Sequence, residues 1–165
     1  MTLQSAKIRD DATSNQPPIN GFANPLVPTL LSLTKTTRAL MGIRLAELGL
    51  HQGQDELLMA LQMDKPVSVS ALSETLVVRP STVSKMLDRL CAKGLVERLP
   101  SPRDARLTLV KLTQDGQAAK TGVRLLWDMI EVELAGKMAP DGKDDILGAL
   151  GTIDGIIGSR LMRLR

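Results

Sequence analysis

Long amphipathic stretches lie towards both ends of the chain. In residues 25–48, apolar side chains recur at the spacing of one helical face, with Pro28 near the start and Gly49 just past the end. The same spacing returns in residues 114–138 and again in residues 144–164. The pattern predicts three long helices. The apolar stripes of the first and last are too wide to be buried in a single chain this helical, so they predict a dimer.

The centre of the chain carries shorter elements. Residues 52–63 show one short helical pattern, and Ser68 is a good N-cap for the next helix. Pro80 suits the first position of a fourth helix. Segments 95–99 and 106–112 are then typical of two strands joined by a polar turn. These elements predict a mainly α protein with a small β-hairpin, in which two short helices form a helix-turn-helix and the hairpin forms a wing.

The amino-acid composition narrows the range of possible functions. The 165 residues suggest one domain, and no apolar run approaches the ~18 residues of a membrane span, so no membrane contact is expected. The first residues lack the apolar stretch of a signal peptide, which predicts a cytoplasmic protein. One cysteine and one histidine cannot form a disulfide framework or a Cys/His zinc site within one chain. No glycine-rich phosphate loop or hydrolytic triad occurs, so we expect neither a cofactor nor an enzyme.

Charge is unevenly distributed along the chain. Residues 79–111 contain eight basic and three acidic residues, a balance of +5, whereas residues 112–157 contain four basic and eight acidic residues, a balance of −4. A local concentration of positive charge is expected of a surface that binds nucleic acid. The alternative is a solvated basic surface, because charge blocks alone are weak signals.

The fourth helix carries the candidate contacts with DNA. Its apolar face, with Val83, Met86, Leu87 and Leu90, is expected to pack on the core. Hydroxyls and helix N-terminal amides on the other face suit phosphate, while Lys and Arg also reach guanine edges. A solvated helix face is the alternative. The predicted DNA-contacting residues of this helix are Arg79, Ser81, Thr82, Ser84, Lys85 and Arg89, with Asp88 on the same face.

Segment 66–113 resembles the winged helix of MarR/SlyA-type transcription regulators. The wing signature D-x-R, followed by L-T, is present as Asp104-Ala105-Arg106 and Leu112-Thr113. The runs LDRLCAKGLVER at 87–98 and LHQGQDELLMAL at 50–61 match the same family. The flanking helices match it in length and apolar pattern, so the resemblance extends over residues 25–165.

The resemblance implies an obligate homodimer on a pseudo-palindromic duplex site. Residues 1–23 would be a flexible tail and residues 24–165 one domain, with dimerisation helices at 24–49 and 114–165 flanking a winged helix at 50–113. Two recognition helices would enter successive major grooves, and two wings would reach the minor groove. In each wing Asp104 would brace the hairpin by pairing with an arginine. Either Arg103 or Arg106 would enter the minor groove, whose narrow form attracts a guanidinium.

The resemblance also implies a small effector, often aromatic or phenolic, that weakens DNA binding. Candidate pocket residues are Arg38, Met41, Met59 and Met63, with core filling as the alternative for the methionines. Cys91 is expected to be a packed thiol. A winged-helix module that binds protein rather than DNA is the main rival, and it would need an apolar outward face on the fourth helix. An enzyme with a site in the dimer crevice is a weaker rival.

Overall fold

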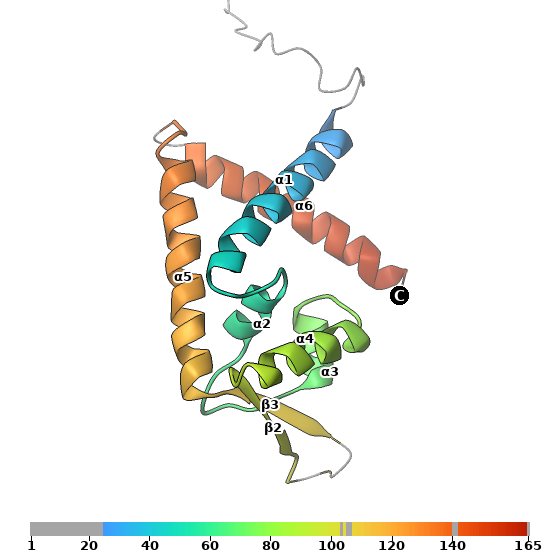
Figure 1. The fold of residues 1–165 in the computed structure, drawn as a ribbon. Helices are drawn as coiled ribbons and strands as arrows, with labels where there is room; N and C mark the ends of the chain where they lie inside the picture. Colours follow the sequence, from blue (N-terminus) through green and yellow to red (C-terminus); the bar gives the residue numbers. More distant parts are fainter. Residues whose placement is uncertain (1–24, 103, 105–106, 140–141, 165) are drawn as a thin grey trace, which may run out of the picture. The chain divides into compact units, whose positions relative to one another are not determined.

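The computed structural model describes residues 25–102, 104, 107–139 and 142–164, so the predicted tail at 1–23 lies outside the described residues. The chain divides into two compact units, residues 1–40 and 41–165. The described part of the first unit is Pro25 and the beginning of helix α1 (Leu26–Glu47), and the rest of α1 and the other elements belong to the second unit (Figure 1). Among the described helices, none has both the length and the hydropathy needed to cross a bilayer.

Three short helices follow α1: α2 (Gln54–Ala60), α3 (Val69–Thr75) and α4 (Pro80–Ala92). As predicted, the Ser68 hydroxyl caps α3 by accepting the N–H of Ala71 at 3.2 Å, and Pro80 is the first residue of α4. Helix α2 is shorter than the predicted 52–63. Gly53 precedes it with a φ of 83°, and Leu61 is extended directly after it, so the helical backbone is interrupted on both sides.

The turn between α3 and α4 contains a strained backbone conformation that the sequence does not predict. Val77 has a φ of 54°, a left-handed conformation that is rare for a β-branched residue. Its N–H bonds to the Glu74 carbonyl and the N–H of Val78 bonds to the Ser73 carbonyl, the pattern of a Schellman helix end. The same pattern ends α1 and α4, where the left-handed residues are Gly49 and Gly94. The turn of the helix-turn-helix therefore has a valine at the position where the ends of α1 and α4 have glycine.

The strands are β1 (Val67–Ser68), β2 (Val96–Pro100) and β3 (Thr108–Leu112), in the antiparallel order β1-β3-β2. The predicted hairpin is present as β2 and β3, and Figure 1 shows it projecting beyond α3 and α4. Strand β1 was not predicted, because two residues are too few for an alternating pattern. It pairs Val67 with Val110 and so attaches the start of α3 to the sheet.

Helices α5 (Gln114–Ala135) and α6 (Gly142–Arg163) complete the chain and end within three residues of the predicted boundaries. The Thr113 hydroxyl caps α5 by accepting the Gly116 N–H at 3.0 Å. A Cβ at Gly116 would lie 1.8 Å from the Leu95 carbonyl oxygen, so only glycine allows α5 to start this close to the sheet.

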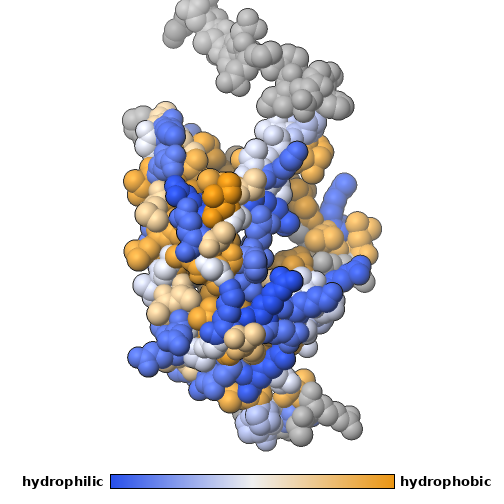
Figure 2. All heavy atoms as spheres, in the orientation of Figure 1, coloured by the Kyte–Doolittle hydropathy of each residue, from blue (hydrophilic) through white to orange (hydrophobic). Residues whose placement is uncertain are grey.

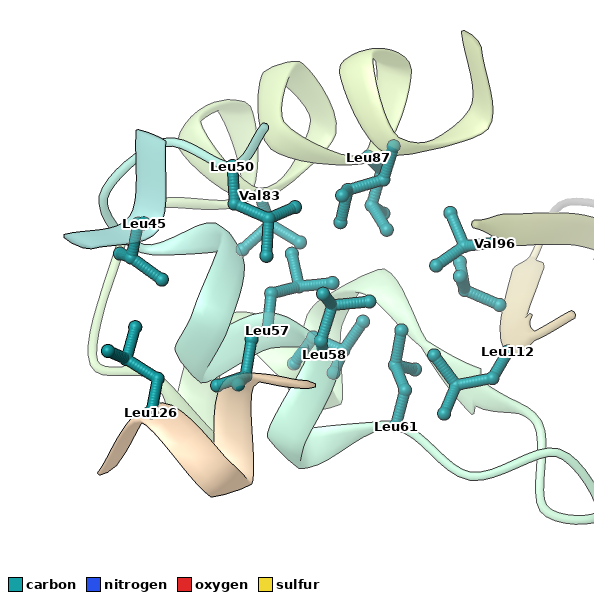
Figure 3. Close-up of a cluster of buried hydrophobic side chains, with 14 residues drawn as sticks. Leu45, Leu50, Leu57, Leu58, Leu61, Val83, Leu87, Val96, Leu112 and Leu126 are labelled. Atoms are coloured by element: carbon teal, nitrogen blue, oxygen red, sulfur yellow. The ribbon is translucent and has the colours of Figure 1, made fainter. Parts of the chain in front are cut away.

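One core holds the second unit together. Its fourteen buried apolar residues come from the end of α1, the α1–α2 loop, α2 and its C-terminal cap, α3, α4, β2, β3 and α5 (Figure 3). Leu57 and Leu58 of α2 lie between Leu45 and Leu126 on one side and Leu112 on the other. Helix α6 contributes no buried residue. The space-filling view shows apolar residues at the surface along α5 and mainly hydrophilic ones lower on the same face (Figure 2).

Candidate nucleic-acid interface

The core fixes which side of α4 faces solvent. Val83, Leu87 and Leu90 are fully buried, as predicted. The opposite side of the helix is therefore turned outward and is polar and basic. Its exposed residues are Arg79, Ser81, Thr82, Lys85, Asp88 and Arg89, while Ser84 is half-buried at the edge.

The wing is tied to α4 by an ion pair. Arg98 of β2 donates from Nη2 to the Asp88 carboxylate at 2.7 Å and lies 3.4 Å from the Ser84 carbonyl oxygen. The sequence prediction missed Arg98, because no periodicity links a helix to the strand after it. Opposite charges at positions 88 and 98 were the available signal. The contact sets the position of the wing relative to the outward face of α4.

The same pair changes the charge that α4 presents. The Asp88 carboxylate is compensated by Arg98, and Glu97 is compensated by Lys111 directly across the hairpin at 3.1 Å. Within the described residues, no ion pair involves Arg79, Lys85 or Arg89. These three cations are therefore available to an anionic partner, while the neighbouring carboxylates are occupied.

The tip of the wing is described only in part. Ser101 donates its N–H to the Leu107 carbonyl, and Leu107 donates to the Asp104 carbonyl, both at 3.0 Å. Asp104 is exposed at this tip. Arg103 and Arg106 lie outside the described residues, so their predicted entry into the minor groove stays a prediction.

Two lysines connect the winged helix to the long helices. Lys120 of α5 donates to the carbonyls of Met59 at 3.0 Å and Leu61 at 2.7 Å, where α2 ends. Lys93, just after α4, donates to the Gly49 carbonyl, just after α1. Both ammonium groups bind carbonyls at helix ends, where the helix dipole favours a positive charge. The bonds fix α2 and α4 against their neighbours.

A cavity of about 730 Å³ lies between α2, α5 and α6 and is lined mostly by apolar side chains. Of the predicted pocket residues, Met41 lines it. Met59 packs against the core instead, and Met63 is exposed on the surface. Arg38 belongs to the first unit. The lining residues are Met41, Asp55, Glu56, Trp127, Ile130, Glu131, Leu134, Ala135, Met138, Lys143, Ile146, Leu147 and Leu150.

Other candidate chemistry is limited in the described residues. Cys91 is partly buried against the core, which agrees with the predicted packed thiol. His51 is exposed before α2. Among the described ranges, no three His, Cys, Asp or Glu residues are grouped to hold a metal ion.

Comparison with known proteins relates this site to the MarR family. The model of the MarR family matches residues 48–107, which include α2 to α4 and the first strand of the wing. The Multiple antibiotic resistance protein MarR of Salmonella typhimurium is 34% identical over 94 residues, which cover 57% of this chain and 65%, just under two thirds, of that protein. Over this part the chain is similar to proteins of the MarR family.

Solved structures of the MarR family agree with this fold. A MarR mutant from E. coli, solved in complex with operator DNA, superposes with a TM-score of 0.70 at 28% identity, covering 78% of this chain and 93% of that one. A MarR protein from Peptoclostridium difficile superposes with a TM-score of 0.80 at 15% identity, covering 91% and 98%, a likeness of fold. The curated relatives include proteins named as transcriptional regulators or repressors, and none is named as an enzyme.

Proposed function

We propose that this protein is a homodimeric transcription regulator of the MarR family that binds a pseudo-palindromic duplex site in the cytoplasm. The observation that carries the proposal is the outward face of α4, where Arg79, Lys85 and Arg89 have no ion pair among the described residues. A helix enters the major groove, where Lys and Arg reach phosphates and guanine edges. The operator complex of the E. coli relative supports the same use of this fold.

The polar face of α4 argues against the rival function. A module that binds a protein through this helix would present an apolar outward surface, because the fully buried core of such an interface is depleted of charged residues. Here the exposed residues of α4 between its two ends are cationic or carry hydroxyls, apart from Asp88, which is paired, and the exposed apolar residues Pro80 and Ala92 are small and lie at opposite ends of the helix. Duplex DNA is therefore the better match.

A second copy of the chain is the proposed partner of α6. This 22-residue helix has no buried residue, and its apolar side chains Ile156, Ile157 and Met162 are each more than half exposed. Apolar surface of this extent is expected to be covered. In the proposed dimer it packs against the partner, and two copies of α4 are held about one helical turn of DNA apart.

The proposed effector is a small aromatic molecule that binds the cavity lined by Met41 and Trp127. It can release DNA only if it binds more tightly to a conformation that DNA disfavours. The two lysine bonds that tie α2 and α4 to the long helices offer a path for such a change.

Selection of bound duplexes from a random library with the purified protein tests the function. The expected result is an inverted repeat with half-sites about one helical turn apart. Binding to that site should weaken steeply with salt, by ~0.9 in log affinity per unit of log salt for each phosphate neutralised. No enriched motif together with a flat salt dependence would reject DNA binding and favour the protein-binding rival.

A further inference from the structure

The charged residues that line the cavity are predominantly acidic. Among the described residues of the lining, Asp55, Glu56 and Glu131 provide three carboxylates and Lys143 provides one ammonium group. Lys143 already pairs with Glu131, so its charge is engaged. The hydrogen bond and the charge attraction between them lower the pKa of Glu131 and raise that of Lys143, which keeps both groups ionised near neutral pH. The carboxylates of Asp55 and Glu56 are left as the excess charge.

Asp55 is the unusual member of this group. Its residue is only 5% exposed, and its Oδ1 accepts the Gly53 N–H at 3.0 Å. In the part of the chain that the structure describes, no lysine or arginine forms an ion pair with it. A carboxylate buried beside an apolar cavity is unfavourable unless a positive charge or further hydrogen bonds compensate it. The cavity therefore offers a negative site within otherwise apolar walls.

We propose that the cavity binds an amphiphilic organic cation, with the ammonium group on the Asp55 carboxylate and the apolar body against Trp127, Ile130 and Leu147. Apolar walls with a few placed polar groups are usual for small-molecule sites. Trp127 belongs to the lining, and the face of an indole ring attracts cations. This assignment refines the proposed effector from any small aromatic molecule to one that carries a positive charge.

Two contacts connect this site to α4. Asp55 accepts a hydrogen bond from the N–H of Gly53. Gly53 has a φ of 83° and forms the turn before α2. Gly53 lies against α4, because a Cβ built on it would be 3.1 Å from the Met86 sulfur. Asp55 is therefore linked to α4 through one intervening residue, Gly53. A cation that binds the Asp55 carboxylate can change the position of α4 through this link. The effect on DNA rests on the proposed function, and a coupling of the usual size would weaken DNA binding by about 5- to 150-fold.

Three probes of nearly equal shape test the charge preference without any mutation. They are 4-tert-butylbenzylamine, which is cationic near neutral pH, the neutral 4-tert-butylbenzyl alcohol and the anionic 4-tert-butylbenzoate. Trp127 is the only tryptophan of the chain and lines the cavity, so its fluorescence reports binding directly. The expected order of affinity is cation, then alcohol, then anion. Equal affinities, or tightest binding of the anion, would overturn the proposal.

A matched pair of variants then tests the residue. Asp55→Asn keeps the shape and the oxygen that accepts the Gly53 N–H but removes the charge, so it should weaken the cation at least about tenfold and leave the alcohol nearly unaffected. Asp128→Asn removes a carboxylate from the exposed side of α5, outside the cavity lining, and should change neither. An unchanged affinity of Asp55→Asn for the cation would contradict the assignment. If that variant does not fold, Glu56→Gln, which should lower cation affinity a fewfold, decides in its place.

The last step separates the two proposals. Binding of the amine is measured with and without the selected duplex. If the amine lowers the affinity for DNA by some factor, DNA must lower the affinity for the amine by the same factor. If the protein binds the amine selectively but does not bind DNA, the cation site is supported and the proposed function is rejected. DNA binding without charge-selective ligand binding would do the reverse.

Discussion

The winged helix and α6 use similar apolar residues in opposite ways. Fourteen apolar side chains from the winged helix and its neighbours are buried in one cluster, and residues such as Leu57, Leu58 and Leu87 have no exposed surface. Helix α6 is three times as long as α2 and has no buried residue, with Ile156 59% exposed. A hydrophobic pattern therefore identifies a helix but not what covers it. In the winged helix the covering surface belongs to the same chain, and for α6 we propose a second copy.

A pair of alanine substitutions separates the two kinds of apolar residue. Leu58→Ala should lower the free energy of unfolding by about 2–5 kcal/mol, because it leaves a cavity in a fully buried site. The loss should not depend on protein concentration. Ile156→Ala should lower stability in a way that grows as the protein is diluted, since it weakens a contact between copies. Urea unfolding at several protein concentrations checks both, and concentration-independent losses of similar size would remove the distinction.

Within the winged helix, the Arg98–Asp88 contact should matter more for DNA than for folding. An ion pair this exposed contributes ~0–1 kcal/mol to stability. Arg98→Ala should nevertheless weaken DNA binding by about 1 kcal/mol or more, because Asp88 then faces the phosphates with its charge uncompensated. Adding Asp88→Asn to Arg98→Ala should restore part of the affinity. Anisotropy measurements in which the double variant binds no better than Arg98→Ala would reject this role.

The strained turn offers a smaller test, of opposite sign. Val77→Gly should raise the free energy of unfolding by about 1 kcal/mol, because it relieves a left-handed backbone that L-residues disfavour. Gly94→Val, at the equivalent place in the turn after α4, should lower it. Chemical denaturation measures both changes. A loss of stability in Val77→Gly would mean that the contacts of the valine outweigh its backbone strain.

The smallest expected effect belongs to the pair that joins α5 to α6. Since the Glu131 pKa is lowered by Lys143, its contribution to stability is present above the unfolded pKa of about 4.5 and is lost as the pH falls through the folded value. Lys143 has a raised pKa, so its contribution is present below about 10.5 and is lost as the pH rises beyond it. Glu131→Gln should therefore flatten the decline of Tm in acid. A decline identical to that of the parent protein would show that the pair is not formed in solution.

Local chemistry explains what the sequence predicted. Ser68, Pro80 and Thr113 act at helix starts through bonds or dihedral limits within a few residues, so the elements were placed nearly correctly. The outward face of α4 was also predictable, because its apolar face is set by helical spacing alone. The MarR resemblance added the minor-groove role of the wing and the expectation of an effector.

What the sequence did not reveal depends on distant contacts. Strand β1 exists because Val67 pairs with Val110, and Arg98 matters because the sheet brings it to Asp88. The cavity is built largely from α5 and α6, and of the predicted pocket residues Met41 alone is in its lining. In the family that the sequence resembles, an aromatic residue is common at position 55, so Asp55 itself indicated that the effector pocket differs, but not that its carboxylate is buried.

The central claim is that the outward face of α4 binds duplex DNA, and one measurement tests it directly. The affinity for the selected duplex is followed against salt for the parent protein, Lys85→Ala, Arg89→Ala and the control Arg124→Ala, an exposed cation of α5. Each α4 variant should reduce the steepness of the log–log plot by ~0.9 for every phosphate that the missing side chain would have neutralised. If the side chain contacts a base edge, affinity should also fall by about 1–3 kcal/mol. Arg124→Ala should match the parent, and four indistinguishable plots would contradict the account.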